Sequence, residues 1–174
     1  TAGGGSLEPS TGTTDANGQA STQWTLGPAA GTNTAQAIVS GVGQAEFTAE
    51  AAAGSASQIV IVSGNAQTGP AGAPLGSGLV VRVTDDGDNP VSGVPVTWTV
   101  QSGGGSVSPP SVTTGADGLA STAWTLGASV GTQRVQASAP GAGSVQFTAT
   151  STVGAAAVLG LVTQPSAQAQ VGIV

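Results

Sequence analysis

Short stretches in which apolar and polar residues alternate recur along the chain. In "VPVTWTV" (94–100) every second side chain is Val or Trp, and Pro and Thr occupy the positions between them. The segments 79–84, 119–126 and 144–150 alternate in the same way. Because successive side chains of an extended strand point to opposite faces, each segment predicts a β-strand with one buried face.

Turn-forming residues separate these predicted strands. Gly, Pro, Asn and Asp gather at "DDGDNP" (85–90) and at similar points between the other segments. The dipeptides Asn17-Gly18 and Asp117-Gly118 predict tight hairpin turns, because such pairs accept positive φ angles. The alanine-rich stretches are too short and too often interrupted by Gly to form stable helices. Seven or eight short strands in about 100 residues predict an all-β fold, an antiparallel β-sandwich.

The chain repeats itself at an interval of 100 residues. The segment "TTDANGQASTQWTLG" (13–27) returns as "TTGADGLASTAWTLG" (113–127). Aligning residues 1–74 with 101–174 needs no gap and gives 29 identities. Random pairing at this composition would give roughly nine, so the repeat is not a product of composition. One unit has the size of a small sandwich domain.

This interval divides the chain into three parts. Residues 54–153 form one complete repeat, bordered by joints rich in Ala and Gly. Residues 1–53 are then the C-terminal half of a preceding repeat, and residues 154–174 are the first strand region of a following repeat. We therefore expect the sequence to be a window on a longer tandem array.

The composition limits the partners that such an array binds. Charged residues make up 6% of the chain and the net charge is −6, whereas 39% of residues are hydrophobic, which is enough for a core. A nucleic acid needs clusters of Lys and Arg, and so does a polybasic membrane contact, but the only basic residues of the chain are Arg82 and Arg134. No apolar run approaches the ~20 residues of a membrane span. Neighbouring repeats of the same chain are the expected partners, and identical chains in a fibre are the alternative.

The inventory of side chains argues against catalysis. The chain has no His, Cys, Lys or Tyr, so the usual general bases and nucleophiles are missing. Its eight acidic residues include Glu8, Glu46 and Glu50, which are spread over predicted solvent-facing or joint positions. A pair of acids facing each other in a cleft is not predicted. We expect no enzyme activity and no catalytic residues.

Three tryptophans have two interpretations. Trp24, Trp98 and Trp124 could form a platform on which sugars stack. However, each indole shares the apolar phase of its strand with Val or Leu, which favours burial in the core.

The acidic turn at 85–89 is a candidate metal site. Asp85, Asp86, Asp88 and Asn89 place four oxygen-bearing side chains within five residues, and Ca²⁺ binds six to eight oxygens. The spacing differs from that of an EF-hand loop, and Asn89-Pro90 is by itself sufficient for a solvated turn. The calcium hypothesis and the turn interpretation both stay open, and no other cofactor is expected.

The stretch "LVVRVTDDGDNPVSGVPVTWTVQSGGGS" (79–106), followed by "TTGADGLASTAWTLGASVG", resembles the bacterial immunoglobulin-like domain, group 1, the repeat of invasin and intimin. Two positions depart from the family pattern, Trp98 where Phe is common and Asp88 where Gly usually precedes Asn-Pro. The resemblance implies tandem immunoglobulin-like sandwiches in a secreted, rod-forming protein at a bacterial cell surface.

Three functions are consistent with these observations. The first is a structural spacer in the extracellular stalk of an adhesin-like protein. The second is a subunit of a self-assembling extracellular filament, because the edge strands lack the Lys that usually blocks pairing between edges. The third is an adhesion module that binds a host protein or a glycan. The first is the one that the resemblance implies most directly.

Overall fold

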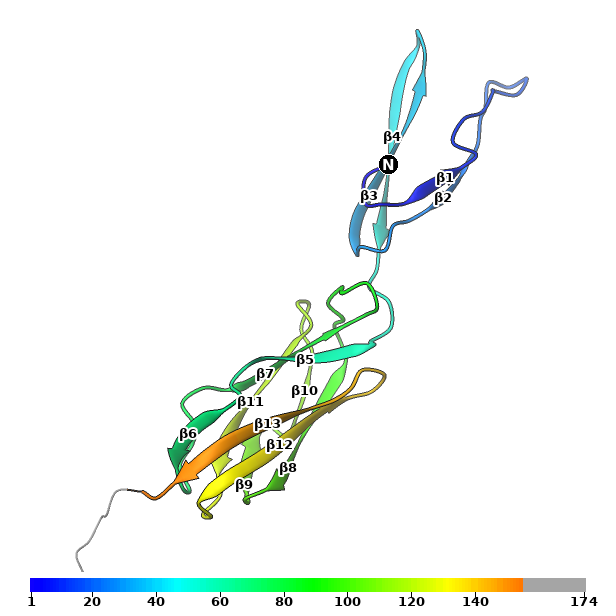
Figure 1. Cartoon of the computed structure of the whole chain (residues 1–174). Helices are drawn as coiled ribbons and strands as arrows, with labels where there is room; N and C mark the ends of the chain where they lie inside the picture. Colours follow the sequence, from blue (N-terminus) through cyan, green and yellow to red (C-terminus); the bar gives the residue numbers. More distant parts are fainter. Residues whose placement is uncertain (155–174) are drawn as a thin grey trace, which may run out of the picture.

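The structure, a computed structural model, describes residues 1–154, so the predicted region 154–174 lies outside the described residues except for Gly154. The described part contains strands and no helix, and hence no helix that could cross a membrane. Figure 1 shows two bodies joined end to end. The strands are β1 (Ser6–Glu8), β2 (Gln23–Thr25), β3 (Gly31–Val39), β4 (Gly43–Ala51), β5 (Gln58–Ser63), β6 (Gln67–Pro70), β7 (Leu79–Thr84), β8 (Pro95–Ser102), β9 (Gly105–Ser108), β10 (Ser111–Thr113), β11 (Leu119–Leu126), β12 (Gly131–Ala139) and β13 (Gly143–Thr152).

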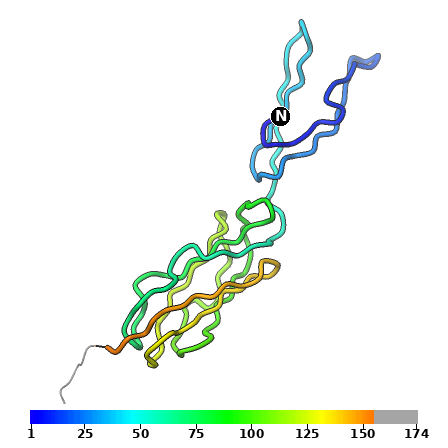
Figure 2. The backbone as a smooth tube through the Cα atoms, viewed as in Figure 1, coloured from blue at the N-terminus to red at the C-terminus, as the bar shows by residue number. Residues whose placement is uncertain are grey.

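Strands β5 to β13 build a complete β-sandwich. One sheet has the order β10-β8-β12-β13-β6 and the other has the order β5-β7-β11-β9. The smooth trace in Figure 2 shows how the chain passes back and forth between the two layers. The all-β sandwich predicted from the alternating segments is therefore confirmed.

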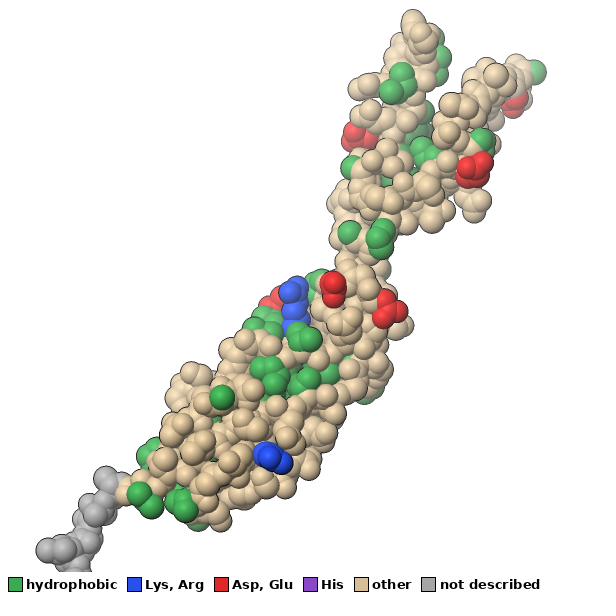
Figure 3. All heavy atoms as spheres, in the orientation of Figure 1, with side chains coloured by type: hydrophobic (Ala, Val, Ile, Leu, Met, Phe, Trp, Pro, Cys, Tyr) green, Lys and Arg blue, Asp and Glu red, His purple; other side chains and the backbone are tan. Residues whose placement is uncertain are grey.

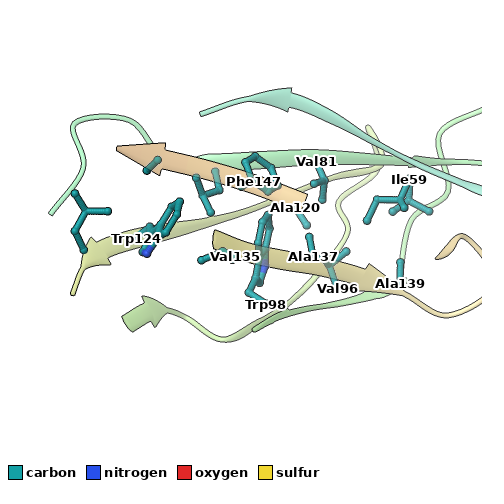
Figure 4. Packing of buried hydrophobic residues seen from close by; sticks show 14 residues of the cluster. Ile59, Val81, Val96, Trp98, Ala120, Trp124, Val135, Ala137, Ala139 and Phe147 are labelled. Atoms are coloured by element: carbon teal, nitrogen blue, oxygen red, sulfur yellow. The ribbon is translucent and has the colours of Figure 1, made fainter. Parts of the chain in front are cut away.

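The core of this sandwich lies between the two sheets, where the predicted apolar faces meet. Trp124 and Phe147 are the largest fully buried side chains, and the Trp98 and Phe147 rings have centroids 5.6 Å apart (Figure 4). In β8, Val96 and Trp98 are buried while Thr97 and Thr99 are exposed, as the alternation predicted. Every buried hydrophobic residue of this cluster lies between Ile59 and Ala149.

Three details differ from the sequence-based expectations. The sandwich has nine strands, and β6 pairs with β13 in parallel, so it is not wholly antiparallel. The turn at Asp117-Gly118 is tight, with Gly118 at φ 72°, but it does not close a hairpin. It connects β10 to β11, which belong to different sheets. The hairpin prediction was wrong there because turn-forming residues determine how the chain bends locally. They do not determine which strands pair with each other.

Residues 1–53 form a second, partial sandwich. Strand β1 pairs with β2 and β3 pairs with β4, and these pairs repeat β9–β11 and β12–β13 with an offset of 100 residues. Residues 19–22 form no strand, although their counterparts 119–122 pair with β7. Phe47 is 55% exposed, whereas its counterpart Phe147 is fully buried. The partial sandwich therefore contains the strand pairs of the second half of the fold and an open apolar face.

Candidate functional site: the joint between the domains

The loop between β7 and β8 lies at the neck where the two bodies meet (Figure 1). Its acidic end, 85–89, is the segment in which the sequence predicted calcium ligands. Asp85 is only 6% exposed, whereas Asp86 and Asp88 are exposed. The three side chains therefore occupy different environments although they are close in sequence.

The Asp85 carboxylate organises the loop by accepting hydrogen bonds. The Oδ1 atom accepts from the Gly87 and Asn89 N–H groups, both at 2.9 Å. The Oδ2 atom accepts from the Gly54 N–H at 2.6 Å, which ties the loop to the linker between the domains. The Asn89 Nδ2 group donates to both oxygens, at 3.1 and 3.0 Å. Asp85 thus fixes the turn, the linker and the orientation of the Asn89 side chain together.

The Asn89 side chain reaches across the joint to the loop 27–31 of the partial sandwich. Its Nδ2 donates to the Pro28 carbonyl at 2.8 Å, and its Oδ1 accepts from the Ala30 N–H at 2.8 Å. One amide thereby satisfies a backbone acceptor and a backbone donor of the same loop, 27–31. These bonds join residues about 60 positions apart and connect the two bodies directly. We call the group Asp85, Asn89, Pro28, Ala30 and Gly54 the joint clamp.

Two other residues make the close approach at the joint clamp feasible. A Cβ at Gly87 would lie 3.1 Å from the Pro28 carbonyl oxygen and 2.9 Å from Asn89 Nδ2, so a side chain there would press on the joint. On the other side, Asn33 is 1% exposed and holds the loop 27–31 in shape. Its Oδ1 accepts from the Gly27 N–H at 3.1 Å and its Nδ2 donates to the Gly31 carbonyl at 3.2 Å.

Hydrogen bonding lowers the pKa of the Asp85 carboxyl from its ordinary value of 3.8 to about 2. The largest cause is the hydrogen bond from the Asn89 side chain, followed by the one from the Gly54 backbone N–H, and burial acts in the opposite direction. These donors favour the charged carboxylate. None of the causes is a charged partner, so the shift follows directly from the geometry of the joint clamp.

This lowered pKa predicts how the joint responds to acid. Because the folded pKa lies below the ordinary one, the stabilisation is complete above about pH 4 and is lost as the pH falls through 2. We expect the Gly54 amide resonance to titrate with a midpoint of about 2 in an NMR series. Asp85→Asn should abolish this titration. A midpoint near 3.8 would mean that the hydrogen bonds from Asn89 and Gly54 that lower this pKa do not form in solution.

The calcium hypothesis for Asp85, Asp86 and Asp88 is untested and gains no support from this geometry. Within residues 1–154, no three residues among His, Cys, Asp and Glu lie close enough together to hold a metal ion. The Asp85 oxygens already face N–H donors, which a cation would have to displace. The sequence-based interpretation considered Asn89 as a calcium ligand or a turn residue, and it missed the contact of this side chain with the loop 27–31. No sequence signal distinguishes a turn Asn from one that contacts a neighbouring domain.

A surface depression on the partial sandwich is no better a binding site. It lies along the loop 9–21 of the partial sandwich. Some of the counterparts in the complete domain are buried, namely Thr114, Gly118 and Ala120, because 119–122 pair with β7 and Thr114 holds the Val91 and Val94 backbone. Part of this depression therefore corresponds to positions that the complete sandwich buries. The three tryptophans are not exposed either, with Trp98 and Trp124 in the core and Trp24 half-buried.

The complete sandwich is similar in sequence to a known family of domains. Residues 77–155 match the family model described as bacterial Ig-like domain (group 1). A comparison with curated protein sequences gave no significant match.

Several solved structures resemble the chain. The Escherichia coli adhesin FdeC is 22% identical, with a TM-score of 0.53, over 85% of this chain and 48% of its own. The Yersinia pseudotuberculosis adhesin InvE is 18% identical, with a TM-score of 0.48, over 76% of this chain and 42% of its own. Domains 4 and 5 of the S-layer protein SbsC are 18% identical, with a TM-score of 0.45, over 76% of this chain and 62% of their own. The chain spans less than two thirds of each. At these identities, the similarity to FdeC extends to the fold alone.

Proposed function

We propose that this chain is a spacer segment of a stalk on a bacterial cell surface. Its sandwich domains follow one another end to end and hold another part of the protein away from the cell. The first support is the match of residues 77–155 to the bacterial Ig-like domain family (group 1). The surface location is suggested by the adhesins and the S-layer protein whose folds are similar. The physical argument comes from the joint and from the surface.

We also propose that the repeat boundaries follow the sequence pattern. In this proposal, residues 54–153 are one repeat and residues 1–53 are the C-terminal half of the repeat before it. The register of the strand pairs supports this, since β3–β4 and β12–β13 have the same pairing with an offset of 100 residues. The open face at Phe47 is then the side on which the first half of that repeat packs.

The joint clamp is the observation that carries the spacer proposal. A stalk keeps its outer end far from the cell only when its domains cannot fold back on one another. The linker is short, Asp85 fixes its Gly54 N–H, and Asn89 holds the opposite loop through two hydrogen bonds. Each of the two bonds that the Asn89 amide forms contributes about 0.5–1.5 kcal/mol. Together with the Gly54–Asp85 bond, they restrict both bending and twisting around a short linker.

The rest of the surface is consistent with a non-catalytic role. Most of the visible surface in Figure 3 is backbone or side chains that are neither hydrophobic nor charged. This agrees with a composition in which 6% of residues are charged and in which Thr, Ser, Gln and Gly replace ions. The chain has no His, Cys or Lys with which to build a nucleophile and its base. We infer that its partners are neighbouring domains.

Small-angle scattering tests the spacer proposal. The chain should give an extended profile that EDTA does not change, because hydrogen bonds and not metal ions hold the joint. Asn89→Ala should lower the mean radius of gyration, and Asp86→Asn is the matched control because Asp86 is exposed and forms none of the bonds of the joint clamp. A compact profile for the unmodified chain would contradict the spacer proposal. Collapse on adding EDTA would instead support calcium at Asp85, Asp86 and Asp88.

A further inference from the structure

The opposite end of the complete sandwich repeats the surface that Asn89 holds. The 100-residue register places Ala128 at the position of Pro28 and Val130 at the position of Ala30. At the joint, Pro28 supplies its carbonyl and Ala30 supplies its N–H. Both groups belong to the backbone, so the substitutions at 128 and 130 keep the acceptor and the donor.

A buried amide side chain holds this second loop in shape, as Asn33 holds the first. Gln133 is 1% exposed, and its Oε1 accepts from the Gly127 N–H at 2.8 Å. Its Nε2 donates to the Gly127 carbonyl at 3.1 Å and to the Ser129 carbonyl at 2.7 Å. Three hydrogen bonds therefore order the loop 127–131 around the Ala128 carbonyl and the Val130 N–H.

This end of the sandwich is accessible within the described part of the chain. Val130 is 59% exposed and Val153 is 80% exposed. Within residues 1–154, no group donates to the Ala128 carbonyl or accepts from the Val130 N–H. Gly154 also occupies the position of Gly54, whose N–H is a donor in the joint clamp.

We propose that the loop 127–131, with Gly154, is a docking surface for the Asp-x-x-x-Asn loop of a following repeat of the same type. The Asn of that loop would bind the Ala128 carbonyl and the Val130 N–H through its amide, and its Asp would accept from the Gly154 N–H. The occupant is identified by the joint within this chain, where the equivalent surface carries the loop 85–89. This inference rests on the proposed spacer function and adds the rule by which successive domains connect.

A chain with one more repeat tests the inference directly. A second copy of residues 54–153 is placed after Val153, so that the register is kept and the added domain is one whose fold is known. Hydrogen exchange of the Val130 amide, followed by NMR, is compared with that of the Ala30 amide in the same molecule. Relative to the chain of residues 1–174, we expect Val130 exchange to slow by roughly tenfold or more, because a hydrogen-bonded amide exchanges only on opening.

Two matched variants assign the effect to the added loop. Asn→Ala in the added copy of Asn89 should return Val130 to its original exchange rate and leave Ala30 protected. Asn89→Ala at its own position should have the reverse effect. Unchanged Val130 exchange in the extended chain, with Ala30 still protected, would overturn the docking proposal.

The same sample separates this inference from the spacer function. An extended scattering profile without protection of Val130 would refute the docking surface and leave the spacer proposal standing. Protection of Val130 in a molecule with a compact profile would support the docking surface and refute the spacer.

Discussion

Replacing Trp124 with Ala is expected to destabilise the complete sandwich by about 3–5 kcal/mol, the usual cost of removing a large aromatic side chain from a core. Trp124 is 1% exposed and lies in β11, which pairs with both β7 and β9. Its Nε1 has no hydrogen-bond partner, so the whole contribution of the indole comes from packing and burial. A loss of this size is a large part of the 5–15 kcal/mol that stabilises a typical domain. Thermal unfolding followed by circular dichroism measures it.

Trp24 provides the matched control within the same chain. It occupies the equivalent position in β2 but is only half-buried, because the partial sandwich lacks the opposing strands. Trp24→Ala should leave the unfolding transition of the complete domain unchanged. A stable Trp124→Ala variant that had lost binding to a glycan array would contradict the packing interpretation and favour a recognition role.

Alternation and repetition were sufficient to predict the sandwich. The side chains of β8 and β11 alternate so regularly that the buried faces, including Trp98 and Trp124, follow from the sequence alone. A hydrophobic face has one stable location in a sandwich, which is between the sheets. Strand partners are different, because pairing is decided by residues far apart in the chain. The parallel β6–β13 pair and the turn that changes sheets at Gly118 were therefore not predicted.

The joint could be predicted only in part, for a related reason. The loop 85–89 was recognised as unusual because its acidic residues are dense in a chain with few charges. The density of acidic residues, however, does not show which groups their carboxylate oxygens contact. Asp85 accepts from backbone N–H groups and Asn89 reaches a loop about 60 residues earlier, and neither contact has a local signature. The amide pair Asn33 and Gln133, kept in both repeats, was the available signal that the loops beside them are held in shape.

The second large effect concerns the two parts expressed separately. Residues 54–153 alone should fold and unfold cooperatively, because the complete buried cluster lies within them. Residues 1–53 alone should show no cooperative thermal transition. Their only buried residues are Asn33 and Ala35, and Phe47, Ile38 and Val39 are exposed on an open face.

The physical reason is that half a sandwich cannot bury its apolar face, and isolated strand pairs are marginally stable in water. Circular dichroism melting curves of the two fragments, recorded under the same conditions, make the comparison. Far-UV signal that changes gradually with temperature is expected for residues 1–53, and a single sharp transition is expected for residues 54–153. A cooperative transition in residues 1–53 would show that this segment is a complete domain. The proposed boundary at residue 53, and with it the identification of the joint as a contact between successive repeats, would then be wrong.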